Sequence, residues 1–210
     1  MTALAVLVPV KSSDAKSRLS PVLSDSQRKA LAASLFRGLM ATLTRAGLVA
    51  SCRVVSSDRR VLDAARSFGA TPVIEGSDSG VNAAVLAGVR DARGASEFLV
   101  LPSDLPLLRA SDLAALLRLR RLGSTVVMAP SLTFDGTNAL LFPRAPDFPL
   151  SFDSDSFWNH LAGASRLGLT VGVCARKGIM FDVDSPADLR TLAGSGARTE
   201  SARLARAAAQ

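Results

Sequence analysis

Three aspartates in this chain are placed where their carboxylates could bind a divalent cation. Asp104 comes shortly after the apolar run 98–101, and Pro106 prevents a strand from continuing past it. A carboxylate at the end of a buried strand lies at the carboxyl edge of the sheet, where ligands bind in open α/β folds. The pattern around Asp104 fits a helix cap equally well.

Asp182 and Asp184 form the second acidic feature, on either side of Val183. Alternate residues of an extended segment share a face, so both carboxylates point the same way. With Asp104 they would form an oxygen-rich site suited to Mg²⁺, which commonly takes one or two protein carboxylates plus phosphate oxygens. Asp184 could instead cap the helix that begins near Pro186, but capping does not account for Asp182. We therefore expect a metal site.

A basic loop follows the first expected strand. Lys11, Lys16 and Arg18 lie within it, together with three serines that include Ser17. Such a loop at the carboxyl end of a strand is suited to holding a polyphosphate. It contains neither a Walker A motif nor G-x-G-x-x-G. The sequence therefore fits a solvated basic loop without a ligand about as well as a polyphosphate site.

Further polar residues fit the edge of a site. Thr137 and Asn138 follow a sequence typical of a tight turn, and that turn alone would explain them. Residues 153–156 precede an expected helix over 157–167, whose free amides would bind anions in any case. For His160, one turn into that helix, a structural role is favoured because no paired nucleophile lies nearby.

The elements that must position these residues alternate between strand and helix. Strands are expected at 3–10, 51–56, 71–74, 98–101, 125–129, 139–142 and 170–173, and helices at 25–45, 58–68, 80–92, 111–121, 157–167 and 185–192. This alternation predicts an α/β fold with a mostly parallel sheet and helices on both faces. We expect one domain over 1–194 and a mobile C-terminal tail over 195–210. The less regular stretch 129–173 would be an excursion that covers the active edge.

Composition narrows the class of protein. With 210 residues, 48% hydrophobic and 20% charged, the chain is typical of a globular domain, and no apolar run or signal segment indicates a membrane or export. We expect a cytoplasmic protein with Cys52 and Cys174 as buried free thiols. The net charge of +7 suits an anionic partner, and the scarcity of aromatic residues favours phosphorylated small molecules over nucleic acid. His160 is the only histidine, which excludes a His-rich metal site.

Several motifs, each weak alone, occur in an order that resembles one known family. They occupy 8–11 with 15–19, then 80–84, 103–106, 136–140 and 182–189. Together they resemble the 2-phospho-L-lactate guanylyltransferase family of coenzyme F-420 biosynthesis, whose actinobacterial members use phosphoenolpyruvate instead. The resemblance extends from residue 3 to about residue 192.

The resemblance implies a fold, a reaction and partners. The fold would be a single-domain Rossmann-like nucleotidyltransferase, related to molybdopterin guanylyltransferases (MobA-like) and GT-A-like sugar-nucleotide enzymes. The reaction would transfer GMP from GTP to the phosphate of 2-phospho-L-lactate, phosphoenolpyruvate or 3-phosphoglycerate and release pyrophosphate, with Mg²⁺ as cofactor. Partners would be these small molecules and, because the product is labile, the next enzyme of the pathway.

The resemblance also implies roles for individual residues. Metal ligands would be Asp104, Asp182 and Asp184, and the catalytic residues Asp104, Lys11 and Lys16. The triphosphate would contact Lys11, Lys16, Ser17 and Arg18, and the guanosine Asn82 and Ser103. The acceptor would contact Thr137, Asn138, Asp153 and Ser156.

One departure from the family concerns the acceptor. The family commonly carries F-G-P-G-S where residues 152–156 read Phe-Asp-Ser-Asp-Ser, so Asp153 and Asp155 add negative charge where an anionic acceptor should dock. Either aspartate could instead bond a hydroxyl, as 3-phosphoglycerate would offer. Two other functions stay open: a nucleotide-binding module without this activity, and a GT-A-like sugar-nucleotide transferase.

Overall fold

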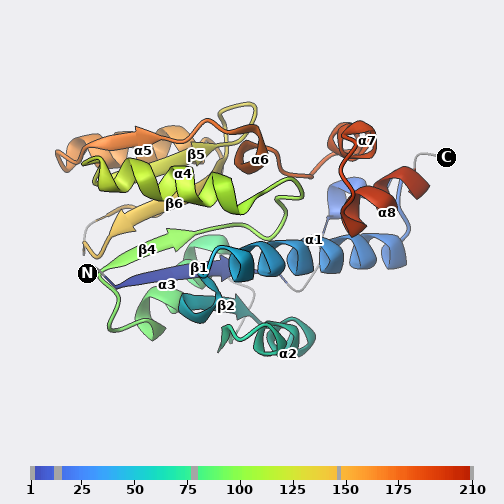
Figure 1. Ribbon diagram of the computed structural model, residues 1–210, viewed down its shortest axis with the longest axis horizontal. Coiled ribbons are helices and arrows are strands. Elements are labelled where there is room, and N and C mark those ends of the chain that lie inside the picture. The colour runs from blue at the N-terminus through green and yellow to red at the C-terminus, as the bar shows by residue number, and fades with distance from the viewer. Residues whose placement is uncertain (1–2, 12–15, 77–79, 146–147, 209–210) are drawn as a thin grey trace.

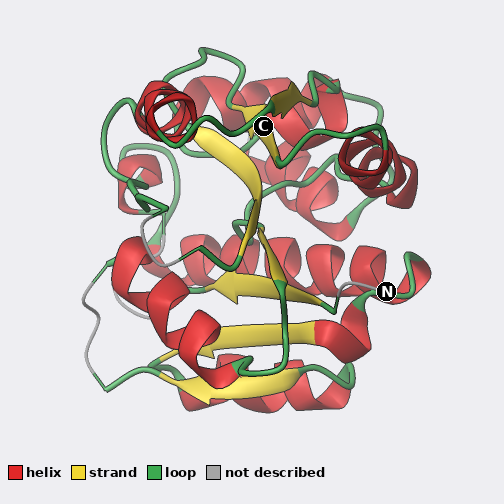
Figure 2. Ribbon diagram, turned by 90° about the vertical axis from the view of Figure 1, so that its left-hand side faces the viewer, coloured by secondary structure: helices red, strands yellow, loops and turns green. Residues whose placement is uncertain are grey.

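The protein folds around a central sheet with helices on both faces (Figures 1 and 2). A computed structural model describes residues 3–11, 16–76, 80–145 and 148–208. In spatial order the described strands run β3-β2-β1-β4-β6-β5-β7, and β6 alone among them is antiparallel to its neighbours. Their bounds are β1 (Leu4–Pro9), β2 (Cys52–Ser56), β3 (Thr71–Ile74), β4 (Glu97–Val100), β5 (Val126–Pro130), β6 (Thr137–Pro143) and β7 (Val171–Val173). The expected mostly parallel α/β sheet is confirmed.

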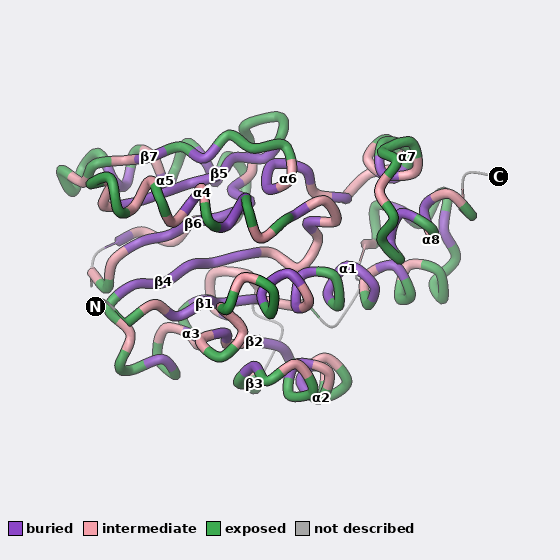
Figure 3. Tube along the Cα trace, in the orientation of Figure 1, coloured by how far each residue is buried: buried purple, intermediate pink, exposed green. Residues whose placement is uncertain are grey.

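Two apolar layers cover the sheet, one on each face. Val6 and Val8 point into the first layer and Ala5 and Leu7 into the second, so β1 is buried on both sides (Figure 3). The first layer is completed by α1 (Asp25–Arg45), α2 (Arg59–Ser67), α4 (Ala110–Arg121) and α6 (Lys177–Met180). The second is completed by α3 (Val81–Asp91) and α5 (Ser156–Arg166).

Helix α1 connects the sheet to the far end of the molecule. Ser24 caps it by accepting a hydrogen bond from the Gln27 amide, and Gln27 reaches back to the Ser24 amide. Its leucines at intervals of four, Leu31, Leu35, Leu39 and Leu43, are all buried. The helix extends beyond the carboxyl ends of the strands, to the right in Figure 1, and there it supports a third apolar cluster.

This third cluster corrects the expectation of a mobile tail from residue 195. The segment carries a helix, α8 (Glu200–Ala208), which packs against α1 and against α7 (Pro186–Gly194). Ala202 and Ala205 are buried there, and Arg37 on α1 pairs with Glu200 at 2.8 Å. Alanine side chains are too short to form a conspicuous apolar stripe, yet they allow two helices to approach closely. The fold therefore continues into residues that the sequence pattern assigns to a tail.

The stretch 129–173 contributes β6 and β7 to the sheet, close to the strands expected at 139–142 and 170–173. β6 enters between β4 and β5, so its first residues lie at the carboxyl edge of the parallel strands. Ala129 pairs with Ala139 whereas Pro130 pairs with Thr137, so Asn138 is an extra residue on β6 and forms a β-bulge. The short elements η1 (Ser17–Leu19), η2 (Val49–Ser51) and α6 were outside the sequence-based expectation as well.

The two cysteines are free and buried, as expected. Burial raises the pKa of the Cys52 thiol to about 12, which keeps it protonated at neutral pH. Within the described ranges, none of the helices combines the length and apolar character that a bilayer crossing requires.

Candidate active site

The three aspartates singled out by the sequence converge at the carboxyl edge of the sheet. Asp104 lies in the loop after β4, and Asp182 and Asp184 lie in the extended segment between α6 and α7. One carboxylate oxygen from each residue lies within 4.8 Å of the other two. Buried Val183 anchors the segment between the two acidic side chains in the third apolar cluster. Chain segments distant in sequence thus form one acidic cluster.

The structure resolves the capping alternatives for these aspartates. Helix α7 is capped by Ser185, whose hydroxyl accepts the Asp188 amide at 3.3 Å while Asp188 accepts the Ser185 amide at 2.8 Å. Helix α4 begins after Arg109, whose amide donates to Asp112 at 3.0 Å. Neither Asp104 nor Asp184 caps a helix, so their carboxylates are available for the cluster.

Lys16 supplies the positive charge inside the cluster. Its Nζ donates to Asp104 Oδ2 at 2.7 Å and to Asp184 Oδ1 at 2.8 Å. Burial lowers the pKa of Lys16, but the attraction of the two carboxylates outweighs burial and raises it overall, so the ammonium stays charged. Arg18 lies 3.9 Å from Asp184 Oδ2. An ammonium that bridges two carboxylates makes the same kind of contact that a metal cation would make.

The chemistry of these donors fits a divalent cation. Asp104 Oδ1 is buried and has no hydrogen-bond partner among the residues that the structure describes. Burial, followed by repulsion from Asp104, raises the pKa of Asp182 to about 6. For Asp184 burial acts in the same direction, but Lys16 and Arg18 outweigh it and the pKa is lowered. A hard cation bound to these oxygens would pair with the unsatisfied atom and relieve the repulsion.

Asn138 connects this cluster to the reversed strand. Its Nδ2 donates to the Met180 carbonyl at 2.9 Å and to Asp182 Oδ1 at 3.1 Å. The predicted site residue Asn138 therefore supports an acidic side chain of the cluster.

A cavity of about 800 Å³ opens beside the acidic cluster, between α1, α2 and the ends of β1 and β4. Its lining is rich in cationic side chains, which include Lys11, Lys16, Arg18, Lys29, Arg37 and Arg60. Ser17 and Ser103 also line it, and their contacts with a nucleotide stay a prediction. The other serines of the basic loop, Ser12 and Ser13, lie outside the described residues. Size and charge suit a phosphorylated small molecule.

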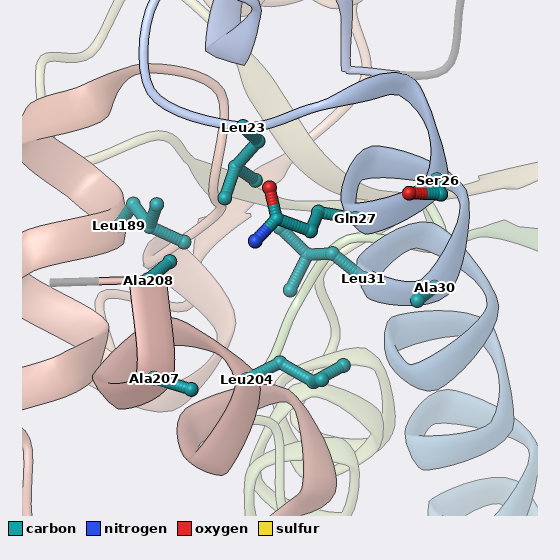
Figure 4. A pocket seen from close by; sticks show the side chains of 9 residues that line it. All are labelled: Leu23, Ser26, Gln27, Ala30, Leu31, Leu189, Leu204, Ala207 and Ala208. Carbon is teal, nitrogen blue, oxygen red and sulfur yellow. The ribbon is translucent and has the colours of Figure 1, made fainter. Parts of the chain in front are cut away.

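A second cavity, of about 280 Å³, lies between α1, α7 and α8 (Figure 4). Its lining is largely apolar, with Leu23, Leu31, Leu189 and Leu204 facing it and Gln27 at its edge. None of the described residues that line it carries a charge for a phosphate.

On the other side of the acidic cluster, Thr137 and Ser156 lie together. Ser156 Oγ donates to Thr137 Oγ1 at 3.1 Å, and Thr137 Oγ1 lies 3.0 Å from His160 Nδ1. Both predicted acceptor residues thus meet at the amino end of α5. His160 is fully buried, and burial lowers its pKa to about 4, so the ring is neutral at physiological pH.

Asn82 contacts the loop on this side, and its neighbour Val81 lines the cationic cavity. Its Oδ1 accepts the Phe152 amide at 2.8 Å and its Nδ2 donates to Asp153 Oδ2 at 3.1 Å. Asn159 holds the same loop by donating to the Ser154 carbonyl at 3.1 Å. Nothing in the sequence marked Asn159, because a single asparagine on a helix has no distinguishing pattern. The role of Asn82 along a guanosine stays a prediction.

Fold and site together define an α/β protein of the nucleotidyltransferase class. The structure resembles a protein of Desulfovibrio desulfuricans G20 described as a nucleotide-diphospho-sugar transferase, with a TM-score of 0.77, 18% identity and coverage of 99% of this chain and 95% of the other. At that identity the likeness concerns the fold alone.

The sequence comparisons identify the family. Residues 4–207 match the model of the family described as "Guanylyl transferase CofC like", and the chain belongs to it. It is 43% identical to a phosphoenolpyruvate guanylyltransferase of Rubrobacter xylanophilus, over 93% of this chain and 96% of the relative. It is 34% identical to a 3-phospho-D-glycerate guanylyltransferase of Phenylobacterium zucineum, over 83% of this chain and 82% of the relative. Relatives named for different acceptors are thus similar to this chain in sequence.

Proposed function

We propose that this protein transfers the guanylyl group of GTP to the phosphate of a three-carbon phospho-acid and releases pyrophosphate, as a step of coenzyme F-420 biosynthesis. One observation carries the proposal: three carboxylates and Lys16 converge beside a cationic cavity at the carboxyl edge of the sheet. Membership of the guanylyl transferase family and the names of the relatives support it.

The reaction needs no covalent intermediate on the protein. An oxygen of the acceptor phosphate attacks the α-phosphorus of GTP, the bond from that phosphorus to the oxygen bridging it to the β-phosphorus breaks, and the electron pair leaves with pyrophosphate. The attacking phosphate is already ionised at neutral pH, so no general base is required. The work of the protein is positioning and charge neutralisation.

Asp104, Asp182 and Asp184 would hold Mg²⁺. When bound, this ion supplies charge neutralisation between two anions that otherwise repel each other. Lys11, Lys16, Ser17 and Arg18 line the cavity and would hold the triphosphate and neutralise the departing pyrophosphate. Ser103, on the same wall, would lie along the guanosine, as would Asn82.

The acceptor would bind where Thr137 and Ser156 meet at the amino end of α5. Hydroxyl donors and free helix amides suit a carboxylate or phosphate. Asp153 and Asn138 would border this site. The charge of Asp153 is already engaged by Asn82, which lessens its repulsion of an anionic acceptor. A labile product would favour direct transfer to the next enzyme of the pathway as a partner.

The test is a screen for pyrophosphate release from GTP with phosphoenolpyruvate, 2-phospho-L-lactate and 3-phosphoglycerate, coupled to the next enzyme because the products are labile. We expect release with at least one phospho-acid, and less with ATP. Binding of GTP without release would indicate a nucleotide-binding module, and release only with a sugar phosphate would indicate a sugar-nucleotide transferase. Either result would reject the proposal.

A further inference from the structure

The chain's only histidine is buried directly behind the proposed acceptor site. Its ring lies between Phe148, stacked at a centroid distance of 6.3 Å, and Phe152, edge-on at 4.7 Å. Both ring nitrogens have polar partners. The Ser151 amide donates to Nε2 at 3.0 Å, and Nδ1 lies 3.0 Å from Thr137 Oγ1. A buried imidazole needs a partner on each nitrogen, and here those partners are the loop backbone at Ser151 and the Thr137 hydroxyl.

These partners determine which nitrogen of His160 carries the proton. A backbone amide can only donate, so Nε2 must present a lone pair to Ser151. The ring is neutral and has a single N–H, which therefore lies on Nδ1. Nδ1–H then points to Thr137 Oγ1 and to the backbone of Ser156, which also hydrogen-bonds the ring.

The hydroxyl of Thr137 can then act only as a hydrogen-bond donor to a further acceptor. Its oxygen accepts from His160 on one side and from the Ser156 hydroxyl on the other, which uses both lone pairs. Its own proton must then be donated elsewhere, and no acceptor for it is recorded among the described residues. Thr137 is buried, with 8% of its surface exposed. An anionic oxygen bound there would accept that proton.

His160 also fixes the backbone of the acceptor loop, which we define as residues 151–156. Its Nε2 holds the Ser151 amide, and Asn82 holds the next amide, that of Phe152. Further along the loop, the Asn159 side chain of α5 donates to the Ser154 carbonyl. Successive amides of the loop are therefore held from α5 and from α3.

We propose that His160 is a positioning residue for the acceptor: it holds the acceptor loop and, as the Nδ1–H tautomer, directs the Thr137 hydroxyl to donate to a carboxylate or phosphate oxygen. This inference rests on the proposed function for the identity of the ligand. The tautomer itself does not depend on that function.

The first experiment reads the tautomer on the intact wild-type protein. Because His160 is the only histidine, long-range ¹H–¹⁵N spectra of ¹⁵N-histidine-labelled protein show one ring without site assignment. We expect a protonated Nδ1 and an unprotonated Nε2 at pH 7.5. Addition of phosphoenolpyruvate, 2-phospho-L-lactate or 3-phosphoglycerate, whichever is the substrate, should shift the Nδ1 signal, whereas inorganic phosphate at the same concentration should shift it less. An Nε2–H ring would overturn the inference.

The second experiment separates positioning from packing. In His160→Gln a carboxamide replaces the ring that donates to Thr137, and we expect the KM of the acceptor to rise about tenfold or more with the KM of GTP within about twofold. Phe148→Leu is the matched control, because it removes a ring stacked on His160 but no hydrogen bond. It should lower stability and leave the acceptor KM within about twofold.

An unchanged acceptor KM in His160→Gln, or an equal rise in Phe148→Leu, would overturn the inference. Should His160→Gln not fold, Thr137→Val tests the same hydroxyl, and a wild-type acceptor KM in that variant would overturn the inference equally. Failure of the proposed function gives a different pattern: the wild-type protein releases no pyrophosphate with any acceptor and no acceptor shifts the Nδ1 signal, while the Nδ1–H tautomer is still observed. In that case the protein has no phospho-acid acceptor for His160 to position. The inference and the proposed function would then both be overturned.

Discussion

The two halves of the site are built from different chemistry. The carboxylate half consists of Asp104, Asp182 and Asp184 with Lys16, and it leaves one buried carboxylate oxygen without a partner among the described residues. The acceptor half is formed by neutral groups around His160, each hydrogen-bonded to its neighbours. Full charges need a cation from outside for balance, whereas the neutral groups hydrogen-bond one another and leave only the Thr137 hydroxyl proton without a recorded acceptor among the described residues. The first half should therefore respond to metal and the second to pH and to loop contacts.

The largest effect should follow from the loss of one charge in the carboxylate half. Asp104→Asn removes a carboxylate that faces both Lys16 and the proposed metal position. We expect turnover to fall about a thousandfold, in line with several kcal/mol of transition-state stabilisation, while circular dichroism shows an intact fold. Asp63→Asn, at an exposed carboxylate on α2, is the control and should keep full activity. Near-normal turnover of Asp104→Asn would show that the carboxylate half takes no part in the reaction.

The acceptor half should make the folded state sensitive to acid. The pKa of His160 is about 4 in the folded protein against an ordinary 6.5, so the unfolded chain takes up the proton first. Its contribution to the free energy of unfolding is complete above pH 6.5 and is lost as the pH falls from 6.5 towards 4, by about 3 kcal/mol in total.

Urea unfolding of wild type and His160→Gln between pH 7.5 and 5, in EDTA, measures that loss. The difference between the two proteins isolates His160, because Asp182, with its raised pKa, contributes in the opposite sense in both. Parallel pH profiles for the two proteins would contradict the assignment of a neutral, buried ring.

Lys16→Met should destabilise the protein only when metal is absent. It leaves Asp104 and Asp184 facing each other without the ammonium, at a cost of about 2 kcal/mol, below that of a fully buried pair because Asp184 is half-exposed. The melting temperature in EDTA should fall by about 5 °C. Addition of Mg²⁺ should raise the melting temperature of the variant by more than it raises that of the wild type. Equal metal responses in both proteins would argue against a shared cation position.

The smallest effect concerns the contact between Asn82 and the acceptor loop. In Asn82→Asp, repulsion from Asp153 should loosen the acceptor loop and raise the KM of the acceptor about fivefold. A change of that size is expected for the loss of one hydrogen bond. Adding Asp153→Asn should restore it. A rise in the KM of GTP instead would show that Asn82 contacts the nucleotide, as the sequence resemblance implies.

Sequence alone located the carboxylate half well. Strand-end placement of Asp104 and alternation at Asp182 and Asp184 follow from short-range rules, so their convergence could be predicted once a mostly parallel sheet was expected. The helix-cap alternative needed the structure, since Ser185 competes for the same position one residue away.

The acceptor half was less predictable because no strand-end or alternation rule brings its residues together. Asn82 meets Phe152 and Asp153 across about seventy residues, and no local pattern signals such a contact. The packing of α8 was missed for a related reason: alanines contribute little to an apolar pattern until a partner helix is in place.

The bulge at Asn138 decides which half receives which side chain. Ala139 and Leu141 of β6 point into the first apolar layer, so strict alternation would send Thr137 there too and turn Asn138 towards α5. The extra residue reverses this order, giving the amide to Asp182 and the hydroxyl to His160. A change in the length of the hairpin between β5 and β6 that removed the bulge but kept both residues would exchange the two groups and disable both halves at once. We therefore expect this hairpin to tolerate changes of residue type far better than changes of length.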